Sequence, residues 1–236
     1  MIKEENRLSF IQGFKAAFPL FIGYFTVSFS IGITASQNGV NWIQAWLMSF
    51  LNHTSAGQAA AILMIGQEES YVAVGLSQLI FNLRYLLMST ALSLKLKEDT
   101  KLSERFIMSY MVTDEIFGLT IMRQGKLNAW FAIGAMCMAG PGWDLGTLLG
   151  AVVGNILPSS FVVALSVVLY SMFIAVIFPP AKKNKFMLIV IFVSMALSGL
   201  VSITPVLKEI SFGTKAILLT IFISLFFAYI RPVEEV

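Results

Sequence analysis

The sequence predicts an all-α, polytopic helical membrane protein. Of its 236 residues, 57% are hydrophobic and only 12% are charged, whereas roughly 25% are charged in an ordinary soluble domain. Between Lys15 and Glu68 lie 52 residues without a formal charge. Because one bilayer crossing needs about 20 apolar residues, the chain has material for about seven or eight hydrophobic segments. We therefore expect a single transmembrane domain over residues 1–236.

Hydrophobic segments follow one another along the whole chain. They lie at residues 13–36, 42–66, 70–94, 104–123, 127–142, 144–178, 186–204 and 214–231. The basic residues before the first segment resemble the start of a signal peptide, but the apolar run behind them exceeds the roughly 7–15 residues of a signal-peptide core. We expect this segment to remain in the mature protein as an anchor. The longest polar stretch, 95–105, is too short for a soluble domain.

Basic clusters set the expected orientation. They lie at residues 3–15, 95–105 and 182–185 and at Arg231. Cytoplasmic loops carry an excess of Lys and Arg, so we expect all these clusters, and both termini, on the cytoplasmic side of the cell membrane. Three full crossings between the first two clusters would place them on opposite sides, which conflicts with this expectation.

Two interpretations remove the conflict. Either segment 42–66 is a re-entrant helical hairpin or a helix broken near Asn52–Gly57, or the N-terminus lies outside the cell. We prefer the break, because residues 52–58 (Asn-His-Thr-Ser-Ala-Gly-Gln) are the most polar and least helix-favouring patch of that segment. Irregular backbone at membrane depth is tolerated where it is buried in protein or lines a water-filled cavity.

A second interruption is compatible with a two-half repeat. Segment 144–178 is too long for one span and contains Pro158, and proline removes a helical hydrogen bond. The two interrupted segments each follow a tryptophan, Trp42 and Trp143, which are 101 residues apart. Corresponding broken helices in two halves of a chain indicate a transporter binding site, although here the halves match poorly residue by residue. The halves would be 13–123 and 127–231.

Glycines indicate where the helices pack closely. Gly146, Gly150 and Gly154 follow one another at four-residue intervals, which is the small-xxx-small spacing of membrane helices in close contact. We expect the same packing role for the glycines of the first segment, Gly13, Gly23 and Gly32.

Charged side chains inside predicted spans are candidates for function. Arg84 lies in the third span, and Asp114 and Glu115 lie in the fourth. Each costs about 2.5–3.5 kcal/mol at a helix centre on insertion scales, so we expect them to be paired or hydrated. The Arg84 guanidinium can bind a substrate carboxylate or pair with Asp114 or Glu115. A purely structural ion pair is equally compatible with its position.

The two adjacent carboxylates raise a geometric question. On one helix Asp114 and Glu115 would point about 100° apart, so both can face one small site only if the helix is broken. A carboxylate in a cavity can bind an ammonium group or carry a proton. Alternatively, segment 104–123 is an interfacial helix whose charges lie among the lipid headgroups.

The polar patch of the second segment supplies further candidates. A broken helix exposes backbone groups, and its N-terminal end carries partial positive charge. His53, the only histidine, is a candidate proton relay because a histidine can change its charge near physiological pH; a hydrogen-bonded structural histidine is the alternative. The candidate substrate- or ion-binding residues are therefore Thr54, Ser55, Gly57 and Gln58 together with Asn82, Arg84, Asp114 and Glu115.

These residues resemble the AzlC family, the large subunit of branched-chain amino acid exporters. The resemblance covers nearly the whole chain, and it depends on the order and spacing of several short motifs. The motifs are Gly13 to Gly32, Thr54-Ser55-Ala56-Gly57-Gln58, Asn82-Leu83-Arg84, Thr113-Asp114-Glu115-Ile116-Phe117, and Trp143 with Gly146, Thr147 and Gly150. Members often carry Pro and Gly in the first span where this sequence has Thr26 and Ser28, so a bend in that helix is not carried over.

The resemblance implies export of Val, Leu, Ile or close analogues, with a small hydrophobic partner subunit of the AzlD type. The residues agree with this expectation. A zwitterion with an apolar side chain needs a cation or a helix N-terminus, a carboxylate and an apolar pocket. Arg84 or the 54–58 break, Asp114 or Glu115, and the abundant Phe, Met and Leu can supply these three features.

Other function classes are less compatible with the sequence. It contains no P-loop for ATP, so coupling to an ion or proton gradient is the simplest hypothesis for active transport. It contains no G-x-S-x-G motif, and we expect no enzyme activity and no catalytic residues. A single cysteine, Cys137, and a single histidine exclude an intrachain disulfide and a Cys- or His-cluster metal site, and we expect neither metal nor cofactor.

The remaining rival is a channel-like or structural subunit whose partner supplies the pathway. A ring of charge, as in a selective pore, would require a homo-oligomer, which the sequence allows. The net charge of +3 comes mostly from loops and indicates topology, not nucleic-acid binding.

Overall fold

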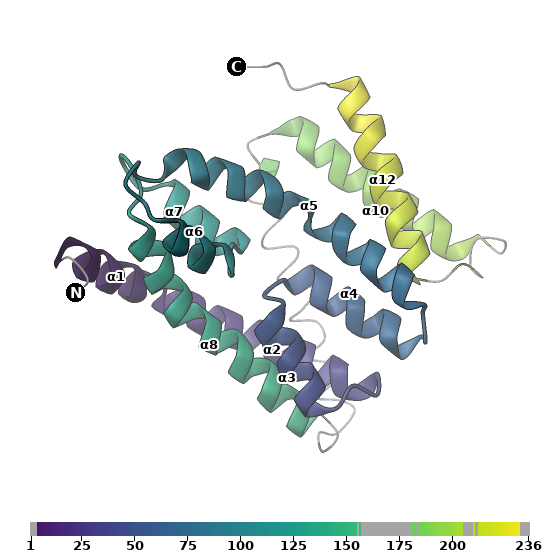
Figure 1. Ribbon diagram of the computed structural model, residues 1–236. Helices are drawn as coiled ribbons and strands as arrows, with labels where there is room; N and C mark the ends of the chain where they lie inside the picture. Colours follow the sequence, from purple (N-terminus) through teal and green to yellow (C-terminus); the bar gives the residue numbers. More distant parts are fainter. Residues whose placement is uncertain are drawn as a thin grey trace.

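The computed structural model describes residues 4–154, 156, 181–182, 184–204, 210 and 212–231. In these residues the regular elements are α-helices, which confirms the all-α prediction (Figure 1). Three of the described helices, α2, α5 and α10, are long and apolar enough to cross a membrane. The helices are α1 (Glu4–Ala16), α2 (Phe18–Gln37), α3 (Trp42–Leu51), α4 (Ser55–Gly66), α5 (Tyr71–Lys95), α6 (Leu102–Ser109), α7 (Asp114–Ile121), α8 (Ala129–Val153), α10 (Lys185–Ile203) and α12 (Phe212–Ile230).

Helices α1 and α2 pack side by side with α8 and run in the same direction as α8 (Figure 1). Gly142, Gly146 and Gly150 of α8 meet the backbone of Phe21, Phe25 and Phe29 in α2. A Cβ at Gly146 would lie 2.5 Å from the carbonyl oxygen of Phe25. The predicted packing role of Gly146 and Gly150 is therefore confirmed. Gly23 differs, because a Cβ there would meet nothing within 4 Å.

Helix α8 corrects one predicted boundary. The sequence suggested separate segments 127–142 and 144–178, but a single helix runs from Ala129 to Val153 with Pro141 inside it. Trp143 therefore lies within a helix and does not begin one. The helix ends before Gly154 as expected, while Pro158 lies outside the described residues.

Helices α3 and α4 form a re-entrant hairpin. The helical backbone stops at Leu51 and resumes at Ser55, which confirms the predicted break. Asn52 ends α3, and Thr54 caps α4 by accepting a hydrogen bond from the backbone N–H of Gly57. The far end of α4 returns to the place where α3 began, because a Cβ at Gly66 would lie 2.2 Å from the Asn38 side chain. The chain thus enters from this end and leaves by the same end, which resolves the orientation conflict.

Helices α6 and α7 form a second re-entrant hairpin, so the prediction of one span at 104–123 is wrong. Each helix has 8 residues and is only about 12 Å long. Both outer ends lie beside the end of α5. Lys95 donates hydrogen bonds to the carbonyls of Ile121 and Arg123, and the backbone N–H of Lys97 donates to Leu127 at 3.1 Å.

The two hairpins are related by an inverted repeat. Helix α2 is followed by α3–α4 at one end of the molecule, and α5, running in the opposite direction, is followed by α6–α7 at the other end. Residues 48–51 (Met-Ser-Phe-Leu) match residues 108–111 (Met-Ser-Tyr-Met), 60 positions later. Thr54 and Thr113 occupy the same N-cap position in the two hairpins. The halves proposed at 13–123 and 127–231 stay a prediction, since 157–180 lie outside the described residues.

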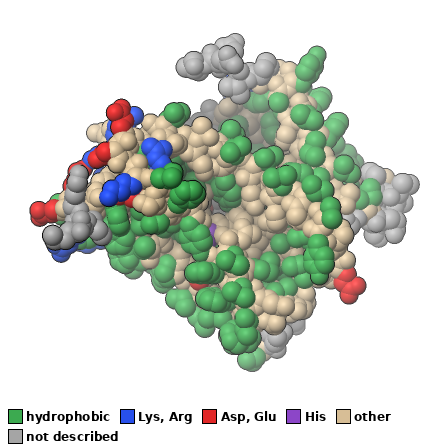
Figure 2. Space-filling view, in the orientation of Figure 1, with side chains coloured by type: hydrophobic (Ala, Val, Ile, Leu, Met, Phe, Trp, Pro, Cys, Tyr) green, Lys and Arg blue, Asp and Glu red, His purple; other side chains and the backbone are tan. Residues whose placement is uncertain are grey.

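Charged side chains gather where the α6–α7 hairpin is rooted (Figure 2). We call this the basic end and define it by Lys95, Lys97, Lys101, Arg123 and Lys126. The start of α1 lies here too, since Lys97 donates a hydrogen bond to Glu5, and this bond raises the pKa of Lys97. The α4–α5 turn at the opposite end carries the acidic pair Glu68 and Glu69.

The last two described helices lie on the outside of the bundle (Figure 1). Helix α12 packs against α5 and α10, with Phe186 of α10 in edge contact with Phe227 of α12. Helix α10 has no buried residue within the described structure. Its apolar surface is thus left uncovered by the other described helices.

Candidate functional site

The tips of the two hairpins meet inside the molecule. The rings of His53 and Tyr110 are in edge contact, with centroids 5.1 Å apart, and the Tyr110 hydroxyl donates to the carbonyl of Phe50. His53 belongs to the α3–α4 break and Tyr110 to the α6–α7 break. The two non-helical stretches, one from each end of the molecule, are thus in direct contact.

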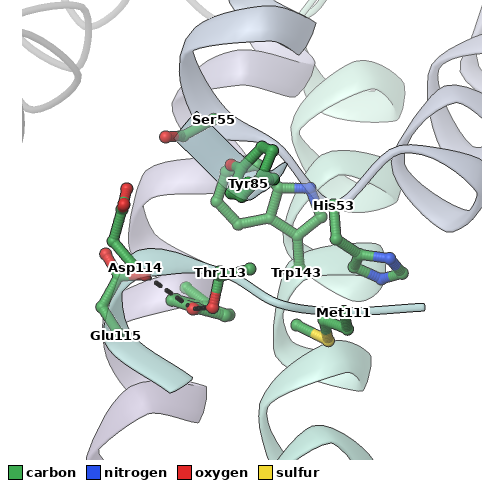
Figure 3. A pocket seen from close by; sticks show the side chains of 9 residues that line it. His53, Ser55, Tyr85, Met111, Thr113, Asp114, Glu115 and Trp143 are labelled. Carbon is green, nitrogen blue, oxygen red and sulfur yellow. Dashed lines mark hydrogen bonds between the residues drawn. The ribbon is translucent and has the colours of Figure 1, made fainter. Parts of the chain in front are cut away.

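A pocket lies at this junction (Figure 3). Its volume is about 280 Å³, but the space that the centre of a water molecule can reach is only about 10 Å³, which is room for about one water. The first turns of α4 and α7 both open onto it, so two helix N-termini with partial positive charge face the same space. The lining residues are Tyr24, His53, Ser55, Tyr85, Met111, Thr113, Asp114, Glu115 and Trp143.

Arg84 pairs with Asp114 at the edge of this pocket. The Nη1 atom of Arg84 lies 2.8 Å from Oδ2 of Asp114, and the two side chains are 39% and 30% exposed. Arg84 sits near the middle of the 25-residue helix α5, about 16–20 Å from either helix end. Its guanidinium also lies over the ring of Tyr85, 5.1 Å from the centroid. One predicted partner of Arg84 is therefore present, and the pair is far from the ends of α5.

Glu115 faces the same pocket as Asp114, which the sequence allowed only with a helix break. The break is present, because α7 begins at Asp114 and Thr113 caps it by accepting from the backbone N–H of Ile116. The Tyr24 hydroxyl donates to Oε2 of Glu115 at 2.8 Å and is also hydrogen-bonded to Thr113. Helix α2 thereby holds the start of α7 in place (Figure 3).

Polar side chains of α5 hold the first turn of α4. The Thr54 hydroxyl donates to Oδ1 of Asn82 at 2.9 Å, and the Gln78 amide donates to the carbonyl of Gly57 at 2.9 Å. Thr54, Asn82 and Gly57 were predicted site residues, and the structure brings them together. Thr54 and Asn82 line a second pocket, of about 500 Å³, on the other side of His53.

Gln58 lies outside both of these pockets. Its side chain is fully buried and accepts a hydrogen bond from the Trp143 indole at 3.0 Å. Its amide donates to Ser49 at 2.7 Å, and Ser49 donates to Thr147 at 2.6 Å. This network, which we call the Gln58 cluster (Ser49, Gln58, Trp143 and Thr147), fastens α3 and α4 to α8.

The pockets form a series that leads toward the basic end. The junction pocket and the second pocket share His53 and Tyr85. The second pocket shares Ser89, Ser109 and Val112 with a third pocket of about 660 Å³ that reaches Arg105. Several hydroxyl groups line this route between α5 and α6. On the side of the junction away from the basic end, the Gln58 cluster holds the first hairpin against α8.

His53 has a carboxylate neighbour that sequence reasoning missed. Its Nε2 lies 3.4 Å from Oδ1 of Asp144 in α8. Asp144 lay at the predicted boundary between segments 127–142 and 144–178 and was not singled out. The four-residue glycine spacing before and after it could have indicated a continuous helix. Tyr24 and Tyr85 carried no sequence signal, since tyrosines are common in apolar segments.

Metal chemistry receives no structural support. Within the part of the chain that the structure describes, no group of three or more His, Cys, Asp or Glu side chains can hold a metal ion. The polar groups of the junction are the Arg84–Asp114 ion pair, the Glu115 carboxylate, the His53 imidazole and several hydroxyls.

Comparisons with known proteins identify relatives that are described as membrane proteins. Residues 19–157 match the family model described as AzlC protein. The chain is 28% identical over 175 residues to an uncharacterized membrane protein of Archaeoglobus fulgidus and 23% identical over 151 residues to the inner membrane protein YgaZ of Escherichia coli K12. It is 26% identical over 153 residues to an uncharacterized membrane protein of Helicobacter pylori J99.

The aligned regions are incomplete on both sides. They cover 73%, 62% and 62% of this chain and 76%, 62% and 66% of those three relatives. The chain thus spans less than two thirds of the length of two of them. No solved structure matches the chain.

Proposed function

Because this chain belongs to the AzlC family, we propose that it is the large subunit of a secondary transporter that exports branched-chain amino acids or close analogues. The observation that carries the proposal is the junction pocket. Two re-entrant hairpins meet there, an arginine–carboxylate pair lies at its edge, and Met111 and Trp143 supply an apolar part of the lining. We propose transport without a catalytic step.

The chemistry of the pocket suits a zwitterion. The Arg84 guanidinium and the α4 N-terminus can receive the α-carboxylate, and Asp114 or Glu115 can receive the α-ammonium group. The apolar side chain would lie against Met111 and Trp143, which line the same pocket. An amino acid can replace the Arg84–Asp114 pair by giving each partner a new opposite charge, so no buried charge is left alone.

The size of the pocket supports a moving pair of hairpins. Room for about one water does not accommodate an amino acid, so the hairpin tips must separate when substrate enters. The series of pockets leads to the basic end, while the Gln58 cluster closes the opposite side. The structure therefore resembles a state in which the junction is tight and is approached from the basic end.

Orientation and partners follow from charge and exposed surface. The positive-inside tendency supports a cytoplasmic basic end in the plasma membrane, with both termini in the cytoplasm. Substrate then enters from the cytoplasm, as export requires. The unburied apolar surface of α10 supports contact with a small hydrophobic membrane subunit of the AzlD type. Without a P-loop, an ion or proton gradient is the proposed energy source.

The first prediction is that the charged pair is required for exchange. We expect Arg84→Ala, Arg84→Lys and Asp114→Asn to abolish or sharply reduce counterflow of labelled valine, leucine or isoleucine in proteoliposomes, alone and with an AzlD-type subunit. Lysine keeps the charge of Arg84 but loses its two-pronged hydrogen bonding. Counterflow measures exchange of amino acid and needs no ion or proton gradient.

Matched controls separate this effect from a general loss of charge. Arg7→Ala and Glu68→Gln change exposed residues at the two ends of the molecule and should leave counterflow unchanged. Near-normal exchange in all three site variants would refute the charged-site proposal. Absence of exchange by the wild-type protein in every reconstitution would refute the transport function itself.

A further inference from the structure

We propose that His53 and Asp144 form the proton-binding site that couples this transporter to a proton gradient. The inference rests on the proposed transport function and names its coupling ion and the residues that carry it. Asp144 belongs to α8, whereas His53 belongs to the tip of the first hairpin. The pair therefore joins a fixed helix to an element that must move.

The His53 and Asp144 side chains are close, but they are not hydrogen-bonded to each other. Nε2 of His53 lies 3.4 Å from Oδ1 of Asp144, and the side chains are 4% and 18% exposed. Within the described part of the chain, neither nitrogen of His53 nor Oδ1 of Asp144 has a hydrogen-bond partner. Buried polar groups are normally hydrogen-bonded, so two facing unpartnered groups are candidates for sharing a proton. A proton between Nε2 and Oδ1 satisfies these two atoms once a small side-chain movement aligns them.

The surroundings of His53 fit an imidazole that approaches α8. Gly140 lies one helical turn before Asp144, and a Cβ there would be 3.9 Å from Nε2. The missing side chain leaves space for the ring on this face of α8. Edge contact with Tyr110 holds the ring from the other side.

The chemistry is the gain and loss of one proton. When Nε2 binds a proton, the imidazolium N–H donates to the Asp144 carboxylate, and the pair has no net charge. When the proton leaves, the imidazole is neutral and Asp144 carries an uncompensated negative charge in an apolar environment. No other bond forms or breaks. The protonated state therefore ties the hairpin tip to α8, and the deprotonated state releases it.

The other titratable groups facing His53 either keep their own protons or already have hydrogen-bond or ion-pair partners. Tyr110 comes from the second break, Tyr85 from α5 and Tyr24 from α2, and phenols keep their protons at physiological pH. The first turn of α7 contributes two carboxylates, of which Asp114 is paired with Arg84 and Glu115 accepts from Tyr24. Asp144 is thus the acidic group that His53 can share a proton with.

The position of His53 links proton binding to substrate movement. Its side chain lines both the junction pocket and the second pocket, so it stands where the substrate must pass. A proton that draws His53 toward Asp144 changes the wall of both pockets. Binding of a proton and passage of substrate then occur in different states, as proton–substrate exchange requires.

The transport test compares two assays on the same proteoliposomes. His53→Gln and Asp144→Asn should both lose accumulation of labelled leucine driven by a pH gradient, while counterflow at equal pH persists in Asp144→Asn, whose residue lines neither pocket. Glu68→Gln, which removes an exposed carboxylate, should change neither. Retained gradient-driven accumulation in both site variants would overturn the inference. Loss of counterflow in Asp144→Asn as well would also overturn it, because the pair would then maintain the pocket and not the coupling.

The second test needs no transport. His53 is the only histidine in the chain, so protein with ¹⁵N-labelled histidine gives imidazole signals from one site. In lipid nanodiscs at a pH where the wild-type imidazole is charged, Asp144→Asn should convert the signals to the neutral form. Unchanged signals would overturn the proton site even if amino acids are transported. Wild-type counterflow without any response to a pH gradient would overturn the coupling and leave the transport function standing.

Discussion

At the scale of single residues, the polar side chains around the junction connect different elements. Arg84 reaches from α5 to α7, Tyr24 from α2 to α7, and Gln58 from α4 to α8. The sequence identified Arg84, Asp114 and Glu115 because charge is costly in a bilayer. It gave no indication of Tyr24, since a phenol is tolerated in many environments and only its partner gives it a role.

Tyr24→Phe tests the link between α2 and the start of α7. The variant removes the donor to Glu115 and should lower the free energy of unfolding by about 1.5–2 kcal/mol, in the lower part of the range for bonds to charged groups because Glu115 is partly exposed. Thermal unfolding in detergent measures this change, and counterflow should fall as well. Tyr71→Phe, at a residue that is 96% exposed, is the control. Equal melting temperatures of the two variants would argue against the link.

At the scale of elements, the two breaks differ in how visible they are. The first break follows an obvious polar patch at 52–58. The second, at residues 110–113, has the sequence Tyr-Met-Val-Thr and is mostly apolar. The hydropathy pattern therefore shows no interruption there. A signal was present nevertheless, because threonine followed by two acidic residues is a typical helix start. Capping chemistry, and not hydropathy, marks this hairpin.

Glycine substitutions test the packing of α2 against α8. Gly146→Ala places a Cβ 2.5 Å from the Phe25 carbonyl oxygen, so the helices must separate, and we expect a loss of about 1–3 kcal/mol as for other overpacked sites. Gly199→Ala is the matched control in α10, where a Cβ would meet nothing within 4 Å, and it should be neutral or slightly stabilising. Melting temperatures of both variants in detergent check this. A Gly146→Ala protein as stable as Gly199→Ala would contradict the close contact.

At the scale of the whole molecule, the inverted repeat places one hairpin at each end of the bundle. Two hairpins enter from opposite ends and meet at one junction, so a movement of either one opens the site to its own side. The Gln58 cluster fastens the first hairpin to α8 in this structure. The second hairpin lies beside the pockets that lead to the basic end. For the proposed transporter, alternating access would result if the two hairpins exchanged these roles.

Side-specific labelling tests the re-entrant topology. With Cys137→Ser as background, single cysteines replacing Asp99 and Gln124 should react with a membrane-impermeant reagent from one side of the membrane. A cysteine replacing Glu68 should react only from the other side, because α3–α4 returns to its own end and α5 crosses. All three residues are exposed in the structure. Reaction of Asp99→Cys and Glu68→Cys from the same side would exclude this topology.

The sequence by itself determined the helical membrane fold, the first break and the identity of the three charged residues inside hydrophobic segments. Hydropathy and charge cost are local properties, so they can be read from composition along the chain. Only the tertiary structure decided that α6–α7 is a hairpin, that Gln58 serves packing and that His53 faces Asp144. These facts depend on contacts between residues far apart in sequence, such as His53 and Asp144. No local pattern encodes them, because the energy of each contact exists only once both elements are in place.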